Sequence, residues 1–99
     1  MLTVRFELRG TPLQPVDEFF SREHRYSLGV DSETGRHYLS IPVTVGAFDY
    51  EEYYALDDGH YARLLESPLA AANFADECRR REHDDLLIIK PGTNRGVGS

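Results

Sequence analysis

The stretch that decides the fold is residues 26–45, which read YSLGVDSETGRHYLSIPVTV. Apolar and polar residues alternate on both sides of a short polar segment, 31–36, in which Gly35 is followed by Arg36. Alternation with a period of two is typical of a half-buried strand, and a Gly in a short loop supplies the positive φ that hairpin turns need. The stretch therefore predicts a β-hairpin.

The two faces of this hairpin indicate the same register. If Asp31 pairs with Arg36, the apolar residues of both strands fall on one face, in the pairs Val30–His37, Leu28–Leu39 and Tyr26–Ile41. Such agreement is required of a correct register, because a slip of one residue would turn every side chain to the other face. On the opposite face Tyr38 lies across from Gly29 and covers it.

A second tight turn at Gly46-Ala47 leads into a further strand that ends near Leu56. The core-facing positions of that strand include Glu52, directly across from Ile41. Pro42 has no N–H to donate, so a bulge near it is also consistent with the sequence. Two alternatives remain: an unbroken register that turns Glu52 toward the core, or a bulge that releases it to solvent.

The following segment has the pattern of two helices. Asp57 or Asp58 is a suitable cap for a turn containing Tyr61, and Ser67-Pro68 is a typical start for a second helix. The second helix carries one apolar stripe at helical spacing, made of Ala71, Phe74, Ala75 and Cys78. Arg79-Arg80-Arg81 in its last turn complements the helix dipole.

The remaining segments complete an α+β domain over residues 1–91. Residues 2–8 alternate as a strand does, Pro15 is expected to open a short helical turn carrying Val16, Phe19 and Phe20, and Leu86–Ile89 has the pattern of a strand buried on both faces. We expect an antiparallel sheet of four to five strands with two C-terminal helices packed on one face, followed by a flexible tail, 92–99.

Composition excludes several classes of protein. The 99 residues carry a net charge of −6, which disfavours binding to nucleic acid. The longest aliphatic run, Leu86–Ile89, is far shorter than the roughly 18–20 residues of a membrane span. The N-terminus has no apolar signal-peptide core, so we expect a cytoplasmic protein. Cys78 is the only cysteine, which excludes an internal disulfide.

The sequence contains no motif typical of catalysis or cofactor binding. It has neither a Gly-x-Ser-x-Gly nucleophile elbow nor a P-loop. Cys78 and His83 do not have the spacing of a zinc site, and His24 and His37 lie about 20 Å apart along the predicted hairpin. We therefore expect no metal, no cofactor and no enzymatic activity.

The strongest functional signal is the acidic segment 49–58, which has five acids and no Lys or Arg. Acids steer a basic partner, and tyrosines supply contact area at low entropic cost. We therefore predict a non-enzymatic interaction or inhibitor-type module that engages a basic protein surface. Its contact strip comprises Asp49, Glu51, Glu52, Tyr53, Asp57 and Asp58.

A second hypothesis is a small-molecule-binding or enzymatic domain. It places a cavity between sheet and helices, lined by Tyr26, His37, Glu52 and Tyr54. A homodimer formed through sheet edges is compatible with both hypotheses.

Overall fold

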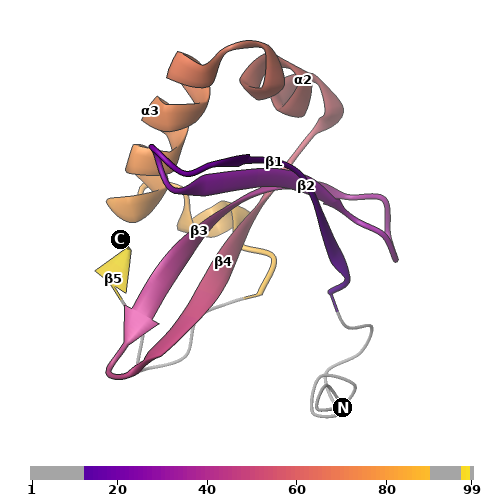
Figure 1. Ribbon diagram of the computed structural model, residues 1–99. Coiled ribbons are helices and arrows are strands. Elements are labelled where there is room, and N and C mark those ends of the chain that lie inside the picture. The colour runs from indigo at the N-terminus through magenta and orange to yellow at the C-terminus, as the bar shows by residue number, and fades with distance from the viewer. Residues whose placement is uncertain (1–12, 90–96, 99) are drawn as a thin grey trace.

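The computed structural model, which describes residues 13–89 and 97–98, shows an antiparallel sheet with two helices on one of its faces (Figure 1). The elements are β1 (Pro15–Ser21), β2 (Tyr26–Asp31), β3 (His37–Val45), β4 (Phe48–Leu56), α2 (Asp58–Glu66), α3 (Pro68–Arg79), the 3₁₀ helix η1 (Asp84–Leu86) and β5 (Val97–Gly98). The four long strands lie in chain order, and β5 pairs with β3. The predicted α+β arrangement is confirmed.

The predicted hairpin forms in the predicted register. Leu28 pairs with Leu39, Gly29 with Tyr38 and Val30 with His37. The Asp31 amide donates to the carbonyl of Arg36 at 2.8 Å, and Gly35 has a φ of +77°. Only glycine takes up this backbone conformation at low cost.

The segment after Pro15 is a strand and not the helical turn predicted from sequence. β1 pairs antiparallel with β2, and its register shifts between Asp17 and Phe19. This bulge adds one residue, so Val16 and Phe19 occupy the same face although they are three positions apart. A spacing of three is also the spacing of neighbours on a helix, which explains the wrong prediction.

β3 and β4 pair without interruption, from His37–Leu56 to Val45–Phe48. The bulge considered near Pro42 is absent from this pairing. Pro42 lies beyond the last β3 residue that pairs with β2, Ser40, and before those that pair with β5. Among the described residues, no strand on that side pairs with residue 42 and requires its N–H.

Both helices begin at the predicted caps. The Asp57 carboxylate accepts from the His60 amide, and the Ser67 hydroxyl accepts from the Ala70 amide, with Pro68 in the first turn. Helix α3 ends in a Schellman motif, in which the Glu82 and Arg81 amides donate to the carbonyls of Glu77 and Cys78. Arg81 takes the left-handed conformation there, with a φ of +64°.

The predicted strand at Leu86–Ile89 is also wrong. η1 occupies the chain as far as Leu86, and only Leu87 forms a bridge, with Tyr54 of β4. The Ile88 amide then donates to the Tyr53 carbonyl, while the Ile89 side chain is exposed. Because η1 occupies the chain up to Leu86, the apolar run Leu86–Ile89 makes a single bridge to the edge of β4 and no strand.

The core lies between the helices and the sheet face that they cover. It includes Leu28, Leu39, Ile41 and Tyr54 from the strands, and the predicted stripe of α3, Ala71, Phe74, Ala75 and Cys78. The strand predicted over residues 2–8 lies outside the described residues. Of the predicted tail, Val97 and Gly98 are described and form β5. In the described part of the chain, no helix is long and apolar enough to cross a membrane.

Candidate functional site

The six residues of the predicted contact strip lie in three places. Asp49, Glu51 and Tyr53 alternate along β4 and lie on the sheet face opposite the helices. Glu52 lies on the helix-covered face, and Asp57 and Asp58 lie at the start of α2. The fold therefore keeps the first three together and separates the others from them.

A third acid, Asp17 of β1, lies on the same face of the sheet. Cross-strand pairs share a face of the sheet, and Asp17 pairs with Gly29, which pairs with Tyr38. We call the set of Asp17, Asp49, Glu51 and Tyr53 the acidic face. The three carboxylate residues are exposed, and Tyr53 is half-buried.

Tyr38 forms an aromatic floor beneath the acidic face. Its side chain is fully buried, and its hydroxyl donates to Asp17 Oδ1 at 2.5 Å. Its ring meets the Tyr53 ring edge-on, with 5.0 Å between the centroids. Burial, together with the nearby charges of Glu51 and Asp17, raises the pKa of Tyr53 to about 12. Tyr53 therefore remains a neutral hydrogen-bonding group at physiological pH.

Two carboxylates of the acidic face, those of Asp17 and Glu51, repel each other. Burial raises the pKa of Glu51, and the charge of Asp17 raises it further, whereas a hydrogen bond from Ser40 and the charge of Arg25 lower it. The net direction is upward, because desolvation and the charge of Asp17 outweigh the two groups that lower the pKa of Glu51. A cation placed beside Glu51 and Asp17 would relieve this repulsion.

Glu52 is buried, with 7% of its surface exposed, which decides between the two alternatives left by the sequence. It pairs with Ile41, and its Oε1 accepts a hydrogen bond from the Tyr54 hydroxyl at 3.0 Å. The same hydroxyl lies 3.4 Å from the Cys78 carbonyl. Glu52 thus belongs to the contact between β4 and α3, on the other side of the sheet from the acidic face.

Asp57 and Asp58 have structural partners at the start of α2. Asp57 caps the helix, and Asp58 Oδ1 lies 3.0 Å from Nδ1 of His37. The His37 ring stacks on Tyr61 at 4.1 Å, and the Tyr61 hydroxyl donates to Glu18 of β1 at 2.6 Å. These contacts connect α2 to both β3 and β1.

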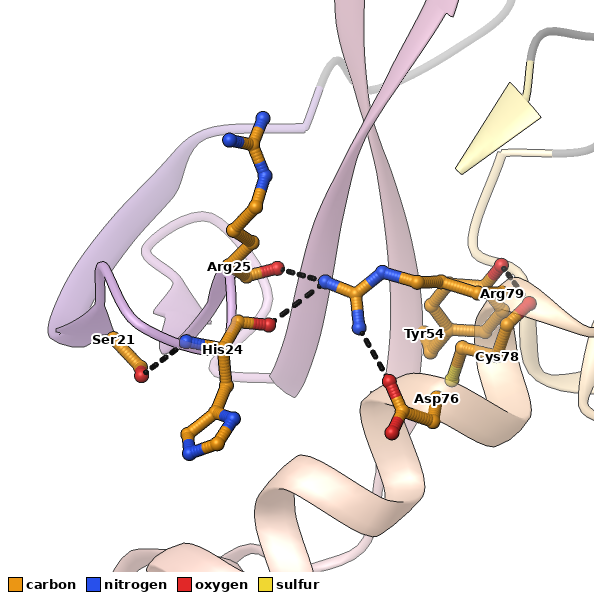
Figure 2. A network of polar contacts seen from close by, with 7 residues as sticks. All are labelled: Ser21, His24, Arg25, Tyr54, Asp76, Cys78 and Arg79. Atoms are coloured by element: carbon orange, nitrogen blue, oxygen red, sulfur yellow. Dashed lines mark hydrogen bonds and ion pairs between the residues drawn. The ribbon is translucent and has the colours of Figure 1, made fainter. Parts of the chain in front are cut away.

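Arg79, the last residue of α3, connects that helix to the β1–β2 turn (Figure 2). Its guanidinium donates to the carbonyls of His24 and Arg25 and also to Asp76 Oδ1 at 2.9 Å. Arg25 has a φ of +53°, which is costly for a side chain larger than Gly. Arg79 therefore holds a strained turn in place and, through it, positions β1 and its Asp17.

Two further features concern metal binding and thiol chemistry in the described residues. No group of three or more His, Cys, Asp or Glu among the described residues is placed to hold a metal ion. Burial raises the pKa of the Cys78 thiol, which keeps it in its unreactive form. Comparisons with protein families, curated proteins and solved structures found no match.

Proposed function

We propose that this protein is a cytoplasmic, non-enzymatic interaction or inhibitor-type module that binds a protein partner through the acidic face. The partner presents a basic surface. The observation that carries the proposal is that Asp17, Asp49, Glu51 and Tyr53 share the sheet face opposite the helices.

Electrostatic and geometric properties of the acidic face support this choice. Its carboxylates add to a net charge of −6, which favours encounter with basic surfaces. The rigid sheet fixes the positions of the charges, and the Tyr38 floor holds the Tyr53 ring in place. Preorganised aromatic and charged groups bind with little loss of side-chain entropy.

Quantitative capture from the host lysate tests the proposal. The bait is the wild-type protein, and the test variant combines Glu51→Lys with Tyr53→Ala. The matched control combines Glu66→Lys with Leu69→Ala, which changes one acid and one exposed apolar residue on the helices. We expect the wild type and the control to capture the same basic protein and the test variant to lose it. Identical partner lists for all three baits would contradict the proposal.

A further inference from the structure

We propose that the partner contributes an extended basic segment, which pairs as an added strand along the free edge of β1. This inference rests on the proposed function and specifies how the partner binds. An extended peptide that joins a sheet gains affinity from its main-chain hydrogen bonds and specificity from its side chains.

β1 presents the edge that such pairing needs. It is the first strand of the sheet order, and no other strand in the described ranges 13–89 and 97–98 pairs with its second side. The contrast with β4 is informative, because the outer edge of β4 is partly covered by Leu87 and Ile88. At seven residues, β1 is long enough to pair with a partner strand of ordinary length.

β1 also exposes apolar side chains on both sheet faces. Val16 is 50% exposed and Phe19 is 43% exposed, although both occupy the face that the helices cover elsewhere. Phe20, on the other face, is 59% exposed. A neighbouring strand would cover the flanks of these side chains and add the burial that β1 lacks.

The charge around β1 determines the chemistry of the partner segment. Asp17 and Glu18 place two carboxylates on β1, where they accept hydrogen bonds from the hydroxyls of Tyr38 and Tyr61. Glu51 lies close enough to Asp17 for its pKa to respond. The turn that follows β1 carries Arg22 and Arg25, so the attraction is concentrated along 15–20 and favours Lys or Arg side chains there.

A second copy of this chain is a poorer occupant of the same edge. Antiparallel pairing of two β1 strands about the bulge would bring Asp17 and Glu18 of one copy beside those of the other. Like charges across a strand pair are destabilising, and an edge bulge is a common obstacle to self-pairing. A basic segment of another protein avoids the charge conflict.

Synthetic peptides test the pairing directly. The probe is an eight-residue fluorescent peptide of alternating Val and Lys, and an alternating Val and Glu peptide is the charge control. Two further peptides carry N-methyl groups on all Lys or on all Val residues, each of which blocks one edge of the extended chain. We expect the Val-Lys peptide to bind at least about ten-fold tighter than the Val-Glu peptide, and one N-methylated form to lose at least about five-fold.

A variant of β1 locates the binding site. Phe20→Ser changes an exposed apolar side chain of β1, and we expect it to weaken binding of the Val-Lys peptide by about three-fold or more. Leu69→Ser changes an exposed apolar side chain of α3 and should leave binding unchanged. Circular dichroism of both variants serves as the control for folding. The inference is overturned if no peptide binds the wild type, if both N-methylated forms bind like the parent, or if Phe20→Ser has no effect. The lysate capture separates the two proposals. If the peptide experiments overturn the pairing but Glu51→Lys/Tyr53→Ala still loses the captured partner, the proposed function stands and only the pairing with β1 fails.

Discussion

At Gly29 the sheet has no room for a side chain. A Cβ built there would lie 2.7 Å from Cζ of Tyr38, and closer still to the Tyr38 hydroxyl and the Val16 carbonyl oxygen. The absent side chain is what allows the Tyr38 ring to lie flat across β2 and reach Asp17. The aromatic floor of the acidic face therefore depends on this one glycine.

Gly29→Ala is expected to lower the free energy of unfolding by about 1–3 kcal/mol, because the added methyl group displaces the Tyr38 ring or the β1 backbone. Urea unfolding monitored by circular dichroism measures the change. Gly59→Ala is the matched control: its nearest neighbour, Asp57 Oδ1, is 3.7 Å away, and the helical site should gain about 0.5–1 kcal/mol. Equal stability of Gly29→Ala and the wild type would show that Tyr38 is not packed as described.

Four tyrosines have a raised pKa in the folded protein and make stability sensitive to alkaline pH, and the increase is large for Tyr38, Tyr53 and Tyr61. Burial and neighbouring carboxylates raise the pKa of Tyr53 to about 12, and burial with a hydrogen bond to a carboxylate raises the pKa values of Tyr38 and Tyr61 still further. In the unfolded chain these groups titrate near pH 10. The folded state therefore retains protons that the unfolded state releases, and this stabilisation is complete below pH 10 and lost as pH rises toward and beyond 12.

The expected result is a Tm that is unchanged up to about pH 10 and then falls as the pH rises toward 12, measured by differential scanning calorimetry at constant ionic strength. Tyr53→Phe removes one of the titrating groups, so its Tm should fall less over the same interval. Parallel Tm curves for the two proteins would mean that Tyr53 titrates as it does in the unfolded chain.

Among the elements, the β2–β3 hairpin and helix α3 could be predicted from sequence because local rules determine them. Alternation and a Gly-containing turn define the hairpin, and Ser67-Pro68 with an apolar stripe defines the helix. β1 could not be predicted, because one bulged residue gave its apolar side chains a helical spacing. Bulges depend on pairing with a distant strand, which a local pattern does not encode.

The acidic face was predictable to the extent that it lies on one strand. Alternation along β4 identified Asp49, Glu51 and Tyr53, but the prediction also included Glu52, which the same alternation turns to the core. Asp17 was missed because its place beside Tyr38 depends on the β1–β2 register and the bulge.

Arg79 is the contact through which α3 fixes the β1–β2 turn. Arg79→Ala is expected to lower the free energy of unfolding by about 1.5–3 kcal/mol, because two turn carbonyls lose a charged donor. Arg80→Ala, which removes the exposed pair with Glu82, should change the free energy of unfolding much less than Arg79→Ala does. Amide exchange by NMR should show faster opening of the turn, 22–25, only in Arg79→Ala. Equal exchange in both variants would contradict the role given to Arg79.

At the scale of the whole molecule, the two faces of the sheet carry different kinds of side chain. Helices α2 and α3 cover one face and enclose the apolar core (Figure 1). The other face holds the acidic face, beneath which the Tyr38 ring is buried. Under the proposed function, the partner contacts this second face, which holds Asp17, Asp49 and Glu51. Surfaces of this kind lose binding with added salt, because screening weakens charge attraction over distances of about 8 Å at physiological ionic strength.

The most direct test of partner binding through the acidic face is hydrogen–deuterium exchange of this protein, free and in complex with the partner that it captures. The proposal predicts slower exchange in β1 and in the first half of β4, residues 49–53, with helices α2 and α3 unchanged. Protection confined to the helices, with β1 and β4 exchanging as in the free protein, would contradict it.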